Sequence, residues 1–368
     1  MIFKEDWDRC KERFNAFWGG EVVDRCCLAV TSPRKQPIDL GISYKKPESL
    51  EQIWLDSELR YQQALYSFAN TFFGGEAFPL FWVNLGPGVG ATFMGSGYEL
   101  AESTVWFDRN PVIKDWKSRS KIKLDEESEM WKTVWHMTEL LCERAKNDFI
   151  VGITDIGGTL DIAVSLRGNE DLLYELYDNP DEVKTLADEI DTAWLEAYDK
   201  FQDLIGSHME GYAAWMGLWC NKRWYPIQCD FSSMISTEMF DEFVAPSLER
   251  QARHMDYAVY HLDGPGQIRH LESILDIDEI TGIQCVPGAT FSEKTGEFHS
   301  TFYSETWIPV YKRIQEKGKN LILPEVHPTE IEDLLDCLSP KGLYISTSCK
   351  SEDEARELLK KVEKHYGK

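Results

Sequence analysis

Short apolar runs alternate with longer amphipathic segments along most of the chain. An apolar run bounded by turn residues is typical of a buried strand, and apolar positions three or four apart are typical of a helix. Helical patterns fill most of the intervals between the apolar runs. Eight runs meet the strand pattern, at residues 27–31, 78–83, 149–155, 211–215, 257–262, 280–285, 320–323 and 343–346.

Three of the helical segments carry clear start signals. The segment 180–205 follows Asn179 and begins with Pro180, which is typical of a first helical turn. Ser236 is a suitable N-cap for a helix over 237–255, and Ser351 is one for a helix over 351–365. Three acidic residues in the first turn of the last helix complement its dipole.

Regular alternation of strands and helices predicts a parallel α/β architecture, and eight units are the number in a (β/α)8 TIM barrel. We expect one domain over 1–368, with an N-terminal helical extension at 1–25, the barrel at 26–350 and a C-terminal helix at 351–368. The first connection, 32–77, is long enough to hold a helical insertion.

The charge of the chain narrows the classes of partner. Its 368 residues include 39 Lys and Arg against 63 Asp and Glu, a net charge of -24. Such a surface repels the phosphates of nucleic acids and anionic lipids, so neither is expected as a partner. Without a long apolar run or a signal-peptide pattern, we expect a cytoplasmic protein. The 9 cysteines are scattered and form no CxxC, which argues against a disulfide framework.

In a barrel, active sites lie at the C-terminal ends of the strands. The residues expected there include Asn84, Asp155, Trp215, His261, Asp263, Gln284, Cys285, Glu325, His327 and Cys349. His261 and Asp263 are two apart on a strand and therefore face the same side. An imidazole and a carboxylate suit Zn²⁺, Mn²⁺ or Fe²⁺. The alternative is that Asp263 caps the following turn and His261 is only hydrogen-bonded.

Two further strand ends carry reactive groups. Cys349 precedes the helix that Ser351 caps, where the positive potential of a helix N-terminus favours a thiolate; the alternative is a small buried hydrophobic residue. Asp155 precedes a glycine pair and is either a base or a cap of its loop. No phosphate-binding glycine pattern is present.

An aromatic cluster follows the fourth expected strand. Trp215, Trp219 and Trp224 form a candidate substrate wall for an aromatic ring or a quaternary ammonium group. The alternative is ordinary core packing or a subunit interface. Lys222 and Arg223 are candidates to hold a carboxylate or phosphate, or they are solvated.

Three segments together resemble the uroporphyrinogen decarboxylase superfamily. They are 13–25, with the sequence RFNAFWGGEVVDR, 166–183, and 230–248, which leads into the His261-Leu-Asp-Gly segment. The resemblance spans nearly the whole chain and implies a (β/α)8 barrel. The arginine-rich stretch of true decarboxylases is replaced here by 26–35, their catalytic aspartate by Asn84 and their histidine loop by 346–349.

The sequence is more similar to the corrinoid-dependent methyltransferase branch, in which an H-x-C pair and a distant cysteine bind zinc. His261 and Cys349 match the outer positions of that pattern, and Asp263 replaces the middle cysteine. The resemblance implies a metal centre that is harder and more Lewis-acidic than a thiolate site. Gln284 lies near the place of a zinc-binding glutamate in distant relatives, and Glu325 or Cys285 are alternatives for a fourth ligand.

The resemblance implies a zinc-dependent methyltransferase that moves a methyl group between a small molecule and a corrinoid. The small molecule is a methoxyaryl, methylamine or thiol compound, bound by Asn84, Trp215, Trp219 and Trp224. The chain lacks the DxHxxG corrinoid-binding motif, so the corrinoid is expected on a partner protein. Homodimers are common among barrels of this family.

Two alternatives remain open. One is a decarboxylase or lyase acting on a small acid or a tetrapyrrole, with Asp155 or His261 as proton donor and Lys222 or Arg223 as the carboxylate anchor. The other is a non-catalytic corrinoid- or tetrapyrrole-binding protein, in which the cysteine-to-aspartate change at Asp263 marks a decayed metal site.

Overall fold

A mainly parallel sheet forms the centre of the molecule. A computed structural model describes residues 1–107, 111–292 and 297–367. Its largest sheet has 7 strands in the order β2-β1-β15-β14-β11-β10-β9, and every pair in it is parallel except β1 with β2. These strands are β1 (Cys27–Pro33), β2 (Thr71–Gly75), β9 (Trp224–Gln228), β10 (Tyr257–Asp263), β11 (Ile280–Val286), β14 (Asn320–Leu323) and β15 (Leu343–Ser348).

The closed barrel expected from the sequence is not seen in the strand pairing. Within the described residues, the hydrogen-bonded ladder stops at β2 on one side and at β9 on the other. β3 (Leu80–Trp82) and β6 (Ile150–Gly152) form a separate parallel pair. A backbone hydrogen bond of 3.0 Å from Ile153 N–H to the Ala213 carbonyl leads on from β6 to the next segment. The fold is therefore α/β with a mainly parallel central sheet.

The fourth expected strand is displaced along the chain. The segment 211–215 contributes only β7 (Tyr212–Ala213), which pairs antiparallel with β8 (Trp219–Cys220). β10 pairs on one side with β11 and on the other with β9, and the sequence pattern did not predict β9. Pro226 interrupts its pattern because proline lacks the N–H that a sheet interior requires. β9 tolerates it as the last strand of its ladder.

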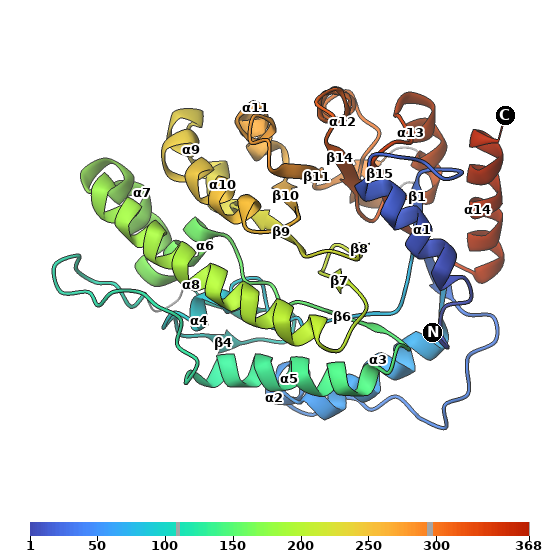
Figure 1. Ribbon diagram of the computed structural model, residues 1–368, viewed down its shortest axis with the longest axis horizontal. Coiled ribbons are helices and arrows are strands. Elements are labelled where there is room, and N and C mark those ends of the chain that lie inside the picture. Colours follow the sequence, from blue (N-terminus) through green and yellow to red (C-terminus); the bar gives the residue numbers. More distant parts are fainter. Residues whose placement is uncertain (108–110, 293–296, 368) are drawn as a thin grey trace.

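Helices surround the strands (Figure 1), with α5 and α8 along one side and α12 and α13 along the other. The helices of eight residues or more are α1 (Trp7–Trp18), α3 (Ser57–Asn70), α5 (Glu129–Ala145), α6 (Thr159–Arg167), α7 (Asn169–Asp178), α8 (Pro180–Gly206), α10 (Ala245–Arg253), α12 (Trp307–Glu316) and α14 (Glu352–Tyr366). The shorter helices are α2 (Leu50–Trp54), α4 (Val89–Thr92), α9 (Thr237–Phe243), α11 (Leu271–Leu275) and α13 (Ile331–Cys337).

The remaining elements are short. They are the hairpins β4 (Glu99–Leu100) with β5 (Val105–Trp106) and β12 (Ala289–Ser292) with β13 (Glu297–Ser300), and the 3-10 helices η1 (Asp230–Met234), η2 (Pro265–His270) and η3 (Pro328–Glu330). Among the described helices, none combines the length and the apolar character needed to cross a membrane.

Most helix predictions are confirmed, with one difference. α8 begins at Pro180, and the Ser351 side chain caps α14 by accepting from Glu354 N–H. The single helix expected over 237–255 is instead two helices, α9 and α10, that meet at Val244. Pro246 lies in the first turn of α10, and its ring cannot donate the N–H that a continuous helix requires. The expected insertion in 32–77 holds α2, α3 and β2.

A buried ionic group ties α1 to the sheet. The fully buried Glu76 carboxylate accepts from the guanidinium of Arg25 at 2.5 Å and of Arg13 at 3.2 Å. It also accepts from the Leu28 N–H of β1 at 2.6 Å. Arg13 belongs to α1, so one carboxylate joins the first helix and the first strand.

Candidate metal and substrate site

Three strands place polar side chains in a row across the sheet. His261 of β10 is paired with Gln228 of β9 on one side and with Gln284 of β11 on the other. Paired positions of parallel strands face the same side of the sheet, and so do positions two apart on one strand. Gln228, His261 and Gln284 therefore share a face, and Asp263 at the end of β10 joins them.

A group of three possible metal ligands lies at the C-terminal ends of β9 and β10. The ligand atoms of Asp230, His261 and Asp263 all lie within 4.8 Å of one another. We call these residues the His261 cluster. Asp230 begins η1, two residues after β9 ends. Pairing of β9 with β10 is what brings the carboxylate of Asp230 to the imidazole of His261.

Gln284 fixes which ring nitrogen of His261 is available. The Nδ1 atom of His261 lies 2.6 Å from the Oε1 atom of Gln284. An amide oxygen only accepts, so Nδ1 carries a proton, and in the neutral imidazole Nε2 keeps its lone pair. The Trp215 ring packs edge-on against the imidazole with ring centroids 4.8 Å apart. The imidazole is thus held in one orientation with one nitrogen free for a ligand.

Burial and neighbouring charges raise the pKa values of two acidic groups at the cluster, Asp230 and Asp161. The pKa of Asp230 is raised by burial and by the nearby Asp263, while His261 acts to lower it. Asp161 of α6 accepts from the backbone N–H groups of Asp230 at 3.1 Å and Phe231 at 2.9 Å. Burial and the charge of Asp230 raise the pKa of Asp161 to about 7. A cation bound here would relieve this repulsion.

A pocket of about 730 Å³ opens beside the cluster at the C-terminal ends of four strands. We call it the strand-end pocket. Its wall includes residues two apart on β1 (Ala29 and Thr31) and on β11 (Gln284 and Val286), as expected for side chains on one face of a sheet. Gln284 and Trp215, which both contact His261, line it as well. Glu325 is charged, and none of the described residues that line the pocket is a lysine or arginine.

Glu325 has an unusual backbone conformation. It follows β14 and has a φ of 53°, in the left-handed region that side chains other than glycine rarely adopt. Its N–H donates to Ser346 Oγ at 2.9 Å, which ties it to β15. The strained conformation holds an exposed carboxylate at the wall of the strand-end pocket.

Asp230 also lines a second pocket, of about 370 Å³. The wall of this pocket combines Asp161 and Asp230 with apolar side chains that include Trp106, Phe107 and Met234.

The structure does not bring Cys349 into the His261 cluster. The backbone N–H of Cys349 donates to the Thr31 carbonyl at 2.8 Å, which places it beside β1. The expectation of a stabilised thiolate is wrong. Burial and the charge of Glu354 raise the pKa of the Cys349 thiol. Glu354 lies in the first turn of α14, so its charge opposes the potential of that helix N-terminus.

Lys222 and Arg223 lie at the N-terminal ends of the parallel strands, whereas the His261 cluster lies at their C-terminal ends. They come directly before β9, at the N-terminal end of that parallel strand. Arg223 is paired with Asp199 at 3.5 Å and with Asp203. The ammonium group of Lys222 lies over the Tyr257 ring, 5.5 Å from its centroid. The structure therefore places both cations away from the C-terminal strand ends, where the sequence analysis expected them to anchor a carboxylate or phosphate.

The three tryptophans of the expected wall are also separated. Trp219 and Trp224 are each 1% exposed and lie in the core. Their Nε1–H groups donate to the carbonyls of Glu210 at 2.9 Å and Tyr212 at 3.1 Å. Trp215 alone of the three lines the strand-end pocket.

Asp155 and Asn84 hold loops at the strand ends. The buried Asp155 carboxylate accepts from Gly157 N–H at 2.9 Å and from the Tyr225 hydroxyl at 3.3 Å. Burial raises its pKa to about 7. The Asn84 side-chain oxygen accepts from Gly86 N–H at 2.9 Å, which stabilises the turn after β3. Neither belongs to the His261 cluster. Of the alternatives for a fourth ligand, Glu325 lines the pocket, whereas Cys285 is buried on the other face of β11.

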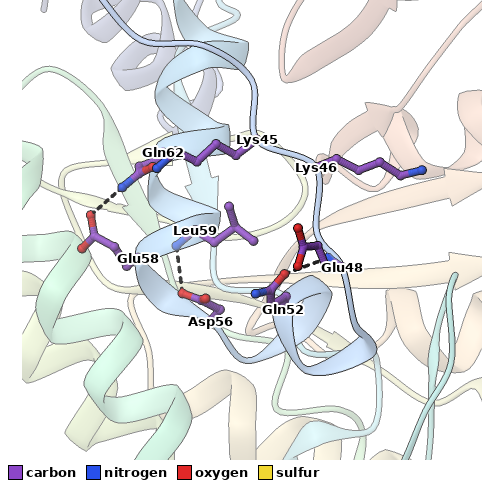
Figure 2. A pocket seen from close by; sticks show the side chains of 8 residues that line it. All are labelled: Lys45, Lys46, Glu48, Gln52, Asp56, Glu58, Leu59 and Gln62. Carbon is purple, nitrogen blue, oxygen red and sulfur yellow. Dashed lines mark hydrogen bonds between the residues drawn. The ribbon is translucent and has the colours of Figure 1, made fainter.

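A surface pocket of about 570 Å³ on α2 and α3 offers no comparable chemistry. Figure 2 shows that the side chains of Gln62, Asp56 and Gln52 each bond to a residue three or four positions away along the chain. The Gln62 amide donates to Glu58 at 3.0 Å, and Asp56 accepts from Leu59 N–H at 2.9 Å. The latter bond is a helix N-cap, so the lining groups serve local structure.

The sequence analysis did not identify Asp230 or Asp161 as site residues. Asp230 was passed over because β9, the strand that delivers it, was not recognised. The available signal was the run Trp224–Gln228 followed directly by Cys229 and Asp230, a strand pattern with an acid at its C-terminal end.

Comparison with known proteins relates the chain to a fold. No protein-family model and no curated protein matches it. Among solved structures, it is similar to a methyltransferase from Methanosarcina mazei, with a TM-score of 0.59 and 15% identity over 98% of this chain and 99% of that chain. The likeness extends over the whole length of both chains, and at this identity it shows that the chain shares the fold of that methyltransferase.

Proposed function

We propose that the protein is a metal-dependent methyltransferase. It moves a methyl group between a small molecule and a corrinoid carried on a partner protein. The observation that carries the proposal is the His261 cluster beside the strand-end pocket, in a fold shared with a methyltransferase. The proposal includes a (β/α)8 barrel, in which β3 and β6 would complete the circle between β1 and β9.

The donor set of the His261 cluster fits a divalent metal. One imidazole nitrogen and two carboxylates are ligands that zinc, manganese and ferrous iron accept. The hydrogen bond from Nδ1 to Gln284 leaves Nε2 as the donor, as is usual for metal-bound histidines. Three protein ligands leave a coordination position open, which is typical of catalytic zinc sites. A metal held there would supply Lewis acidity toward a polar group of the substrate.

The side chains around the cluster have their own parts in this proposal. Gln284 orients the imidazole of His261, and Trp215 packs against its edge. The strand-end pocket holds the small molecule next to these groups and limits the water around it. Asp161 fixes the start of η1 through two backbone N–H groups, and thereby positions Asp230.

The corrinoid is assigned to a partner because this chain has no DxHxxG motif. The strand-end pocket is open at the strand ends, so a cofactor presented by another protein has a route to the small molecule.

Decarboxylation of an acid has less support. No lysine or arginine is among the described residues that line the strand-end pocket. Arg223, which the decarboxylase alternative needs as an anchor, is paired with Asp199 and Asp203 at the other edge of the sheet. A carboxylate substrate in the strand-end pocket would meet the Glu325 carboxylate without a lysine or arginine to balance the charge.

The first test is the metal content of the protein, purified without a histidine tag or chelator. We expect about one divalent metal per chain, and loss of that metal in His261→Ala. His208→Ala is the matched control, because His208 is exposed near the end of α8 and distant in sequence from β10. A chain that takes up no metal when zinc, manganese or iron is supplied would contradict the proposal.

The second test measures the reaction. The metal-loaded protein is mixed with reduced cobalamin and candidate methyl donors, and the absorbance of methylcobalamin is followed. His261→Ala should abolish its formation, and His208→Ala should leave it unchanged. Equal rates with and without the protein would rule out methyl transfer to a corrinoid under this assay.

A further inference from the structure

We propose that the strand-end pocket selects a methylated quaternary ammonium compound that carries an oxygen function at its other end. This inference rests on the proposed function, since it names the class of methyl donor. It is carried by the charge and the aromatic character of the pocket wall.

The electrostatic surroundings of the pocket favour a cation. Glu325 contributes a carboxylate to the wall, and none of the described lining residues is a lysine or arginine. A carboxylate without a lining lysine or arginine creates a potential that attracts an organic cation and repels an anion, and the net charge of -24 strengthens it.

The apolar part of the wall suits a methylated cation. Trp215 lines the pocket together with Phe78 and Tyr344. Quaternary ammonium groups bind to aromatic side chains because the electron-rich ring faces attract the charge and the methyl groups contact apolar surface. Phe78 and Tyr344 are nearly buried, so the partly exposed Trp215 supplies the aromatic surface and Glu325 the carboxylate, the two features that a trimethylammonium group requires.

The pocket also has a polar end. Gln284 lines it and accepts a hydrogen bond from His261 Nδ1, so this end of the pocket is next to the residue that orients the cluster. An oxygen function on the ligand would lie toward that cluster while the ammonium group lies against Trp215 and Glu325. A volume of about 730 Å³ accommodates such a molecule and leaves room for the methyl acceptor.

The transfer step follows from this placement. The C–N bond of one methyl group breaks with its electron pair remaining on nitrogen, which leaves a neutral tertiary amine. The methyl carbon passes to the nucleophilic acceptor, which supplies the electron pair of the new bond. No proton is needed on the leaving group, so the step requires no acid in the pocket.

The test compares two ligands that differ only in charge. Choline has a hydroxyl and a trimethylammonium group, and dimethylbutanol is its neutral isostere with a quaternary carbon in place of nitrogen. We measure the binding of each to the full-length protein by titration calorimetry, without corrinoid. We expect choline to bind at least about tenfold more tightly, as cation recognition by aromatic groups and a carboxylate predicts.

Variants separate the wall groups from general effects of charge. Glu325→Gln should reduce the preference for choline by about fivefold or more and leave dimethylbutanol unchanged. The control is Glu332→Gln, because Glu332 is an exposed acid on α13 outside the strand-end pocket. It removes the same charge and should keep the preference.

The comparison in the unaltered protein decides the proposal without any variant. Equal affinity for the two ligands, tighter binding of dimethylbutanol or no binding of choline would each overturn it. Those results leave the metal content of the protein untouched, so methyl transfer from a neutral donor would stand. Absence of metal with tight binding of choline would instead overturn the proposed function and keep the ligand class.

Discussion

The Nδ1 atom of His261 lies 2.6 Å from Oε1 of Gln284, at positions that are paired across β10 and β11. Gln284 is 2% exposed, so its amide has little freedom to turn away. A ring whose second nitrogen is held in this way presents Nε2 in one direction, which lowers the entropic cost of binding a ligand there.

Gln284→Leu should therefore weaken metal binding about tenfold to a hundredfold without removing it. The leucine leaves the ligands of the His261 cluster intact but no longer orients the imidazole. The measurement is a competition titration against a chelator of known affinity. Gln62→Leu on the outer face of α3 is the control. An unchanged affinity in Gln284→Leu would show that the second nitrogen of His261 has no part in metal binding.

Asp230→Asn and Cys349→Ala distinguish the ligand set in the structure from the one that the sequence resemblance implies. Asp230 lies within the His261 cluster and Cys349 does not. We expect Asp230→Asn to lose most of the metal, because an amide oxygen is a weaker ligand than a carboxylate. Cys349→Ala should keep it. Elemental analysis of both variants after dialysis measures the metal content per chain. Loss of metal in Cys349→Ala and its retention in Asp230→Asn would show that Cys349, and not Asp230, is the ligand.

Local patterns predicted the parts of the site that lie within one strand. His261 and Asp263 follow from the alternation of an apolar run and from the turn after it, and the structure places them together. Asp230 could not be found in this way because its contact with His261 arises from the pairing of β9 with β10. Pro226 concealed β9, since a proline in an apolar run argues against a strand unless that strand lies at an edge.

Burial and a neighbouring charge explain a second difference. The position of Cys349 before α14 is the one that the sequence predicted, yet its pKa is raised. The thiol is partly buried, and Glu354 of the same helix opposes the positive potential of the helix N-terminus. A pattern of residues locates a group on an element, but its ionisation depends on what the fold packs around it.

Asp155→Asn should change how stability depends on pH. Burial raises the pKa of Asp155 from 3.8 to about 7. Between about pH 4 and pH 7 the folded state therefore holds a proton that the unfolded state has lost, and stability falls as the pH rises. Asparagine has no such proton and can accept the same hydrogen bonds. Relative to the unaltered protein, the free energy of unfolding of the variant should therefore increase by up to about 1.4 kcal/mol for each pH unit in this range.

Urea unfolding at several pH values between about 5 and 8 measures the difference. Some pH dependence should remain in the variant, since the pKa of Asp161 is also raised to about 7. Parallel stability curves for the two proteins would show that Asp155 is ionised throughout.

Glu76→Gln should destabilise the fold strongly. The carboxylate is fully buried and neutralises Arg25 and Arg13. Glutamine keeps the size of the side chain but leaves the buried guanidinium of Arg25 without its anion, at a cost of about 3–5 kcal/mol, whereas Arg13 keeps its ion pair with Asp24. Urea unfolding measures this, with Glu357→Gln on the exposed face of α14 as the control. A loss below about 1 kcal/mol would show that water solvates the arginines instead.

Glu325→Gly should make the protein more stable and less selective at once. The φ of 53° at Glu325 is unfavourable for a residue with a Cβ and is readily adopted by glycine. We expect a gain of about 1 kcal/mol in the free energy of unfolding, because the strain is removed while the N–H can still donate to Ser346. The preference for choline over dimethylbutanol should fall as in Glu325→Gln, since both variants lack the carboxylate.

Glu325→Gln keeps the strain and should not gain stability, so unfolding and titration of the two variants separate the conformation from the charge. A glycine variant that is no more stable than the glutamine variant would mean that the left-handed backbone carries no strain. One that keeps the preference for choline would remove Glu325 from the ligand site.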